Sequence, residues 1–284
     1  MIYHSYQPVP ALSPYVQSLH LVVGLPPPGA IREIWPDSCV ELVFGFGAPL
    51  FIVADSRLCQ APPVYRVAAL AGPLRLSTSG LTVIVRAQLH SWGAAPLLGA
   101  ASVRATAPIY ALDDVSWQLL AAAIGRALRA NASDTAIAIV QQALVERIAT
   151  ATVSTRVLAA AQHLRFVGGQ SAIRDLAAQH DISARQLERT FVALSRLGPK
   201  GLARALRFER VRDALWREER GDLTALALRY GYADQAHLAR EVKSFTGQAP
   251  ARLTKALRAD FALLRDLDVA FIQELAASSG HTHR

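Results

Sequence analysis

The chain has 284 residues, of which 52% are hydrophobic and 18% are charged, so it is too apolar to be an intrinsically disordered protein. A chain of this length typically forms two domains. Its two cysteines exclude a disulfide framework and any metal site built from four cysteines. The formal net charge of +8 is typical of a protein that binds a polyanion, although an arginine-rich solvated surface would give the same total.

The positive charge is concentrated in one part of the chain. Residues 1–150 carry a net charge of +1, residues 151–255 carry +8 and residues 256–284 carry −1. Polyanion binding is therefore expected of the middle segment. Residues 1–31 have no charged side chain, but they lack the basic start of a signal peptide, and Pro8, Pro10 and Pro14 interrupt the start of the segment. We therefore expect a cytoplasmic protein without a membrane-spanning segment.

The first part of the chain has the texture of an all-β domain. Turn-forming residues are dense from about residue 12 to residue 110, and short β-prone runs lie between them. These runs are residues 19–23, 39–46, 51–53, 64–70 and 81–89. Short strands at this spacing predict a β-sandwich or a β-barrel.

From about residue 113 onward the sequence is helical in pattern. Residues 114–130 and 134–150 predict two helices, because an acidic pair precedes a run rich in Ala and Leu. Their broad apolar faces predict packing on the barrel or on another subunit. The predicted fold class is therefore α+β. It consists of a β-barrel with flanking helices at residues 1–150, an all-α domain at residues 151–255 and a helical tail at residues 256–284.

One motif occurs twice in the all-α segment. Two segments, residues 173–177 and residues 223–227, each start a predicted helix and end in a Leu-Ala pair. The two segments lie 50 residues apart, and each is followed by a short turn and a second helix. Ala177 and Ala227 supply the small side chain that two steeply crossing helices need where they touch. The repeat predicts two helix-turn-helix units.

The turns and caps of the two units support this interpretation. Gly231 suits the tight turn of the second unit, and Asp181, at the same place in the first, tolerates left-handed geometry better than most residues do. Ser183 and Asp234 are suitable caps for the two second helices.

The outward faces of the second helices carry side chains that suit DNA. Arg can donate two hydrogen bonds to guanine, Gln can pair with adenine, and Arg and Lys neutralise phosphates. The residues expected to contact DNA are Arg185, Gln186, Glu188, Arg189, Gln235, Ala236, His237, Ala239, Arg240 and Lys243. Taken alone they could be ordinary solvated residues, but the repeat, the turns and the local charge favour DNA binding.

Residues 156–253 resemble the DNA-binding domain of AraC-type transcriptional regulators. The segment Tyr230–Leu238, with the sequence YGYADQAHL, resembles the family signature G-F-x-D-Q-S-H-F, and the TGQAP run that ends at Pro250 is similar to the ending T-G-x-x-P. Trp35–Phe44, with the sequence WPDSCVELVF, resembles a P-D-G-C-x-E-L-x-F run in one subgroup, so the resemblance covers nearly the full chain. Arg196 departs from the pattern, because the family usually has Gly there. The entry to the linker helix is therefore expected to be distorted.

The resemblance implies a transcription regulator, by family habit an activator, which binds promoter double-stranded DNA, works with RNA polymerase and forms a homodimer. It also implies a linker helix at residues 199–216 and a cupin-like barrel that senses a small-molecule effector or serves for dimerisation. Candidate effector-contacting residues in the barrel are Trp35, Cys39, Glu41, Arg86, His90 and Trp92. For each of them an ordinary structural role is the competing interpretation, with Cys39 as an inert buried thiol and Glu41 as a solvated carboxylate.

Two other functions compete with ligand-controlled regulation. We expect neither an enzyme nor a catalytic residue, a metal or a cofactor. A catalytic cupin typically holds its metal with a His-x-His pair, and no such pair precedes residue 281. DNA-repair alkyltransferases that carry an AraC-type domain hold their reactive thiol with four cysteines, twice the number in this chain. A constitutive DNA-binding regulator whose barrel only dimerises stays open.

Overall fold

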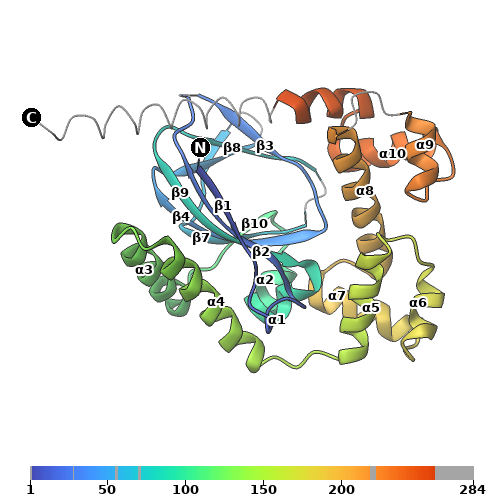
Figure 1. Cartoon of the computed structure of the whole chain (residues 1–284), viewed down its shortest axis with the longest axis horizontal. Coiled ribbons are helices and arrows are strands. Elements are labelled where there is room, and N and C mark those ends of the chain that lie inside the picture. The colour runs from blue at the N-terminus through green and yellow to red at the C-terminus, as the bar shows by residue number, and fades with distance from the viewer. Residues whose placement is uncertain (1, 28, 55–56, 70–71, 218–221, 260–284) are drawn as a thin grey trace, which may run out of the picture.

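The computed structural model describes residues 2–27, 29–54, 57–69, 72–217 and 222–259. Figure 1 shows a β-barrel with helices below it and a separate helical domain to its right. The α+β fold class is thus confirmed, with an antiparallel sheet domain before a helical one. From residue 260 onward the predicted helical tail, with its pair His281 and His283, lies outside the described residues.

Two antiparallel sheets form the barrel. Residues 19–23, 39–46, 51–53, 64–70 and 81–89, the five predicted runs, correspond to β2, β4, β5, β7 and β9, whereas the other five strands were not predicted. The six-stranded sheet has the order β1 (Ile2–Tyr6), β2 (Val16–Gly24), β9 (Thr82–His90), β4 (Cys39–Gly47), β7 (Val64–Val67) and β10 (Ile109–Ala111). The four-stranded sheet has the order β3 (Ile31–Ile34), β8 (Leu74–Thr78), β5 (Leu50–Ala54) and β6 (Arg57–Gln60).

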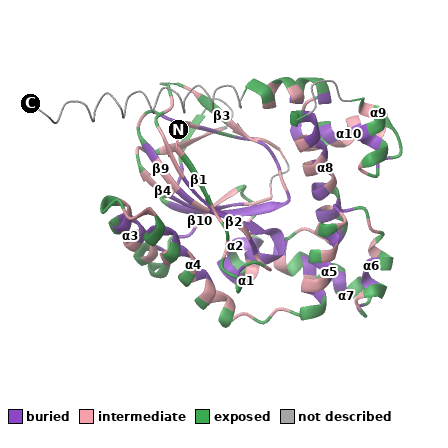
Figure 2. Ribbon diagram, in the orientation of Figure 1, coloured by how far each residue is buried: buried purple, intermediate pink, exposed green. Residues whose placement is uncertain are grey.

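Strand β4 separates the inside of the barrel from its outside. Because side chains alternate along a strand, Val43 points inward and packs with Tyr65 between the two sheets. Leu42 and Phe44 point outward into a second apolar cluster beneath the sheet. The strand is buried on both faces, and Figure 2 shows this part of the sheet as buried.

Helices cover the outer face of the six-stranded sheet. They are the short 3₁₀ turn η1 (Ser91–Gly93), α1 (Ala94–Leu98), α2 (Ala100–Arg104), α3 (Val115–Arg129) and α4 (Ser133–Ala149). The Asp114 carboxylate caps α3 by accepting a hydrogen bond from the Trp117 backbone N–H at 3.2 Å. Trp117 and Ile124 are buried in the same cluster as Phe44. The helices predicted at residues 114–130 and 134–150 therefore exist and pack on the barrel.

The helical domain consists of α5 (Thr155–Phe166), α6 (Ile173–Gln179), α7 (Ala184–Ser195), α8 (Pro199–Arg217), α9 (Leu223–Arg229) and α10 (Gln235–Thr246), with residues 250–259 also helical. It has two hydrophobic cores, one around α6 and α7 and one around α9 and α10. Each core contains a tryptophan from the barrel domain. Trp92 belongs to the first core and Trp35 to the second.

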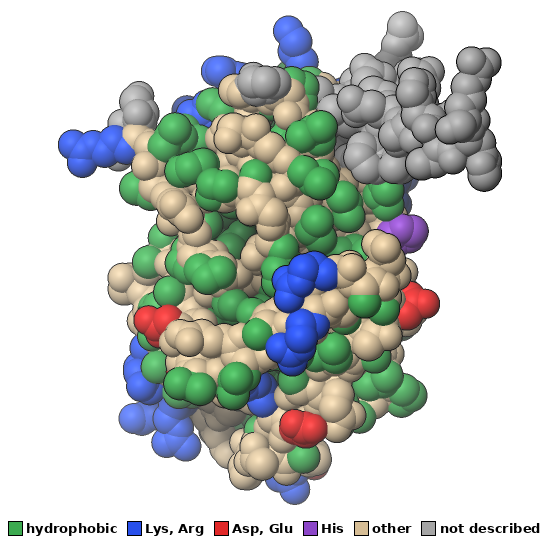
Figure 3. Space-filling view, turned by 90° about the vertical axis from the view of Figure 1, so that its left-hand side faces the viewer, with side chains coloured by type: hydrophobic (Ala, Val, Ile, Leu, Met, Phe, Trp, Pro, Cys, Tyr) green, Lys and Arg blue, Asp and Glu red, His purple; other side chains and the backbone are tan. Residues whose placement is uncertain are grey.

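The surface of the barrel differs from that of the helical domain in charge. Figure 3 views the molecule from the side opposite the helical domain, and hydrophobic and uncharged polar side chains cover most of that face. This agrees with the net charge of +1 on residues 1–150. Among the described residues, no helix is both long enough and apolar enough to cross a membrane.

The position of Trp92 predicts a large loss of stability on its truncation. The side chain is 1% exposed, and its indole N–H donates to the Pro14 carbonyl at 2.9 Å. Trp92→Ala should lower the free energy of unfolding by about 3–5 kcal/mol in urea denaturation, because it leaves a cavity between two domains. Phe166→Ala is the control, since Phe166 is 84% exposed and should change that energy by less than about 0.5 kcal/mol. Equal effects of the two variants would contradict the assignment of Trp92 to the core.

Candidate nucleic-acid interface

The first helix-turn-helix unit consists of α6, a short turn and α7. Ala177 is buried where the helices cross, and the Ile182 N–H donates to its carbonyl at 3.0 Å across the turn. Asp181 takes the left-handed conformation, with φ of 51°, as the sequence indicated. The Ser183 hydroxyl caps α7 by accepting the Gln186 N–H at 3.1 Å. The local sequence therefore determines the angle at which α7 leaves the turn.

The second unit, α9 and α10, repeats this geometry. The Tyr232 N–H donates to the Ala227 carbonyl at 2.9 Å, and Gly231 has a φ of 75° in the turn. The Asp234 carboxylate caps α10 by accepting the His237 N–H at 2.6 Å. The crossing contact, the left-handed turn residue and the cap thus occur in the same order in both units, and the duplication is confirmed as a structural one.

The ten predicted DNA-contacting residues lie on the second helices of the two units, and most are exposed. His237 and Ala239 are half-buried, and the other eight, Arg185, Gln186, Glu188, Arg189, Gln235, Ala236, Arg240 and Lys243, are exposed. The inner faces of the same helices are buried through Leu187 and Phe191 in α7 and through Leu238 and Val242 in α10. Each helix therefore offers one polar face to solvent.

The entry to the linker helix is regular, so the distortion expected there is wrong. Arg196 takes the left-handed position at the end of α7 with a φ of 65°, and Gly247 does the same at the end of α10 with a φ of 71°. Helix α8 then begins cleanly at Pro199, and the Leu202 N–H bonds the Gly198 carbonyl at 3.0 Å. The departure from glycine appears as backbone strain at Arg196 itself, about 1–2 kcal/mol for an L-residue.

Helix α8 connects the two cores. Leu202 and Leu206 are buried in the first core, and Val211 and Leu215 are buried in the second. A bidentate ion pair joins α8 to α10, since Arg204 donates to both carboxylate oxygens of Glu241 at 2.9 Å. The 19 residues of α8 therefore set the distance and the angle between the two units.

Comparisons with known proteins give a family for the helical domain. Residues 176–256 match the family described as "Helix-turn-helix domain". No curated protein sequence matches the chain. The matched segment begins in α6, so it includes both turns and both outward helices.

Three solved structures are distant relatives in shape. ToxT from Vibrio cholerae is 9% identical, with 84% of this chain and 99% of that chain covered and a TM-score of 0.47. A "probable AraC family transcriptional regulator" from Rhodopseudomonas palustris is 22% identical, over 37% of this chain and 99% of that one, with a TM-score of 0.33. The AraC-like transcriptional activator CuxR is 15% identical, over 86% of this chain and 100% of that one, with a TM-score of 0.32.

The family match and the duplicated geometry define residues 176–256 as a helix-turn-helix DNA-binding domain. DNA binding is therefore assigned to the helical domain. The motifs of this domain resemble those of AraC-type regulators.

Only two of the six candidate effector residues line a cavity inside the barrel. The cavity has a volume of about 290 Å³ and mostly apolar walls. Glu41 and Arg86 lie in it and form an ion pair of 2.6 Å, so Glu41 is not a solvated carboxylate. Burial and the negative charge of Glu41 raise the pKa of Tyr65, which lies in the same cavity. Among the described residues, no cluster of three or more His, Cys, Asp or Glu side chains could hold a metal ion.

The other four candidates, Trp35, Cys39, His90 and Trp92, lie outside that cavity, so the structure does not bring the six together. Trp35 and Trp92 pack in the helix-turn-helix cores, and the His90 ring stacks on Trp92 at 4.6 Å. Burial lowers the pKa of His90 to about 3, so the ring is neutral. Cys39 is buried, and burial raises the pKa of its thiol well above the usual value, whereas Cys59 is exposed.

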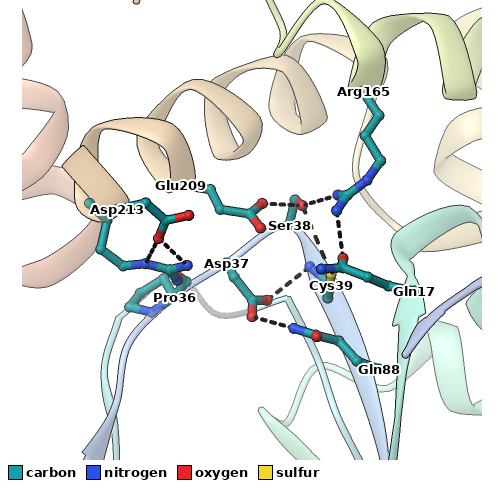
Figure 4. A network of polar contacts seen from close by, with 10 residues as sticks. Gln17, Pro36, Asp37, Ser38, Cys39, Gln88, Arg165, Glu209 and Asp213 are labelled. Atoms are coloured by element: carbon teal, nitrogen blue, oxygen red, sulfur yellow. Dashed lines mark hydrogen bonds and ion pairs between the residues drawn. The ribbon is translucent and has the colours of Figure 1, made fainter. Parts of the chain in front are cut away.

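The segment before β4 forms a polar network with the helical domain, as Figure 4 shows. The Ser38 hydroxyl donates to the Glu209 carboxylate on α8 at 2.6 Å. The Arg165 guanidinium on α5 donates to the Gln17 side-chain oxygen at 2.6 Å. The Arg212 guanidinium on α8 donates to the Pro36 carbonyl at 2.9 Å. The barrel is therefore bonded to both α5 and α8.

Sequence reasoning missed the residues of this network. Asp37 and Ser38 were noted only as part of a family motif, and the partners of Ser38 on α5 and α8 lie more than 100 residues away in sequence. The one available signal was the motif itself, a polar turn placed immediately before a buried strand. No local pattern could have shown that this turn faces α8.

Asp37 is the titratable group of the network that acts near neutral pH. Its carboxylate accepts the Cys39 N–H at 2.8 Å and the Gln88 side-chain N–H at 3.2 Å. Burial first, and then the charges of Glu41 and Glu209, raise its pKa to about 7, and the nearby Arg212 guanidinium opposes this rise. The carboxyl is therefore partly protonated at neutral pH.

This shift predicts a pH-dependent stability. Because the folded-state pKa of Asp37 is raised, its stabilising contribution is complete below pH 3.8 and is lost as pH rises toward about 7. Asp37→Asn imitates the neutral carboxyl, so the unfolding free energy of the wild type should fall relative to the variant between about pH 5 and about pH 8. Urea denaturation at both pH values measures this difference. The lowered pKa values of His20 and His90 make the unfolding free energy rise with pH instead, but this effect is the same in the wild type and in Asp37→Asn. A difference independent of pH would contradict the assignment.

Proposed function

We propose that both helix-turn-helix units of this regulator read promoter DNA together and that an effector in the barrel cavity controls them. The observation that supports DNA reading by both units is the duplicated unit, which has a polar, exposed face on each second helix. Arg185 and Arg189 stand one turn apart on α7, which lets both reach the same groove. Arg240 and Lys243 occupy the matching face of α10.

Electrostatics supports DNA as the partner. The net charge of +8 on residues 151–255 attracts a polyanion, and phosphate neutralisation makes such binding strongly salt-dependent. The net charge of only +1 on residues 1–150 gives the barrel domain no comparable attraction. Contact with DNA is therefore assigned to the helical domain alone.

Strand β4 supports control by an effector. Glu41 lies in the barrel cavity, and Ser38, three residues earlier in the chain, bonds Glu209 on α8. A ligand that displaces the Glu41–Arg86 pair would shift β4 and with it the contact between Ser38 and α8. Because α8 sets the relation of the two units, such a shift would change how they fit two successive grooves of DNA.

The remaining parts of the proposal rest on the resemblance to AraC-type regulators. They are a homodimer, contact with RNA polymerase and activation of the promoter. We place this activity in the cytoplasm. The division into a sensor domain at residues 1–150 and a DNA-binding domain at residues 151–255 belongs to the same proposal. Within the described residues it agrees with the connection between α4 and α5 at residues 150–154.

Substitution of one arginine in each unit tests the reading of DNA. Arg189→Ala and Arg240→Ala should each weaken binding to the cognate duplex by about 1–3 kcal/mol in electrophoretic shift assays. Arg126→Ala is the matched control, because Arg126 is exposed on α3 in the barrel domain and should leave the affinity unchanged.

The duplex used distinguishes base reading from phosphate contact. A residue that reads bases loses affinity for the cognate duplex and not for a scrambled one. Equal losses on both duplexes would mean that these arginines only contact phosphates.

A constitutive regulator whose barrel only dimerises is the second candidate, and a thermal-shift screen separates it from ligand control. A metabolite that binds only the folded protein raises the melting temperature, and Glu41→Gln should weaken that rise because it removes the charge in the cavity. If no metabolite of a broad panel raises the melting temperature or alters promoter occupancy, the constitutive function is correct.

A further inference from the structure

A second cavity lies between the barrel domain and the first helix-turn-helix unit. It has a volume of about 540 Å³ and shares no lining residue with the cavity inside the barrel. One wall comes from β7 and the connection from α2 to β10, and the opposite wall is the turn between α7 and α8. Parts of both domains therefore line it.

Arg66 on β7 is the charged group at the base of this cavity. Its neighbours Tyr65 and Val67 point into the barrel, whereas the Arg66 side chain points outward and is 2% exposed. Its guanidinium donates to the backbone carbonyls of Ser102 at 2.9 Å, Ala105 at 3.0 Å and Ala107 at 3.4 Å. These bonds hold the group in place, but carbonyl oxygens carry no net charge to balance it.

Arg196 brings a second positive charge to the same place. It is the strained left-handed residue that ends α7, and its guanidinium donates to the Ala105 carbonyl at 2.9 Å. One carbonyl oxygen thus accepts a hydrogen bond from each of two like-charged groups, one from each domain. Burial first, and then the charge of Arg196, lower the pKa of Arg66.

Among the described residues, no carboxylate forms an ion pair with either guanidinium. Arg75, Arg86, Arg204 and Arg212, by contrast, each form an ion pair with a carboxylate. A buried arginine is ordinarily paired with an acid, because an uncompensated charge in a low-dielectric interior is costly. Arg66 is such a residue, and the exposed Arg196 adds a second positive charge beside it, so the cavity next to them has the charge of an anion site.

We propose that this cavity binds a small organic anion, with its oxyanion group between Arg66 and Arg196 and its apolar body against the remaining walls. The walls favour an apolar body, since they are lined by Val40, Leu74, Val103, Pro108 and Leu197 and offer few hydrogen-bond donors besides the two arginines. Guanidinium groups bind carboxylate and phosphate oxygens alike, so the oxyanion is the shared chemistry. Such a ligand connects the barrel domain directly to the end of α7.

Calorimetry and thermal unfolding with benzoate and with phenyl phosphate test this site, at an ionic strength held constant with sodium chloride. Each probe that binds should raise the melting temperature of the full chain in a saturable way, by about 3–6 °C at ten times its dissociation constant. Benzamide, which has the same ring and no charge, should not. The better of the two anions identifies the oxyanion.

Variants locate the binding. Arg196→Gly is the main one, because glycine relieves the left-handed strain and the variant should fold at least as well as the wild type. It should bind the anion at least about tenfold more weakly, as should Arg66→Met. Arg126→Ala should bind as the wild type does. The proposal is overturned if neither anion stabilises the wild type, if benzamide does so equally, or if Arg196→Gly keeps full affinity. None of these readouts involves DNA, so they leave the proposed function untouched.

Discussion

The structure depends on two tryptophans that the barrel domain contributes to the DNA-binding domain. Trp92 completes the core of the first helix-turn-helix unit, and Trp35 completes the core of the second. Neither unit encloses its hydrophobic residues with its own chain segment alone. Burial of such large side chains is worth several kcal/mol, so the two domains are held in one arrangement by the same interaction that makes each unit stable. The polar contacts of Ser38 and Arg165 then specify that arrangement and add less energy to it.

This arrangement gives the motif WPDSCVELVF a physical meaning. The residues before β4 and the residues on β4 make different contacts. Trp35, Pro36 and Ser38 contact the helical domain, whereas Glu41 and Val43 face the cavity of the barrel. The segment before β4 thus carries the contact with the helical domain, and the strand that follows it carries part of the wall of the barrel cavity. The proposed effector control rests on this continuity of the chain, because only two residues separate Ser38 from Glu41.

The sequence is most informative where the determinants are local. Ala227, Gly231 and Asp234 each impose a backbone or contact requirement within a few residues, so the amino-acid sequence alone is enough to locate the second unit. Strands β3, β6 and β8 were missed because they are short, and β6 is exposed along its length, which weakens the alternation of apolar and polar residues. The six candidate effector residues lie on different surfaces for another reason. Trp35 and Glu41 are close in sequence and look alike as pocket candidates, but only long-range packing decides which surface each one faces.

The two cysteines differ in a way that has a practical use. Cys39 is buried and its thiol is held protonated, whereas Cys59 lies exposed on β6 at the edge of the four-stranded sheet. Because the thiolate is the reactive form, a maleimide reagent should modify Cys59 and spare Cys39. The chain has no other cysteine. The unaltered protein therefore carries one attachment point for a fluorophore on the barrel, from which motion between the domains can be followed without engineering a single residue.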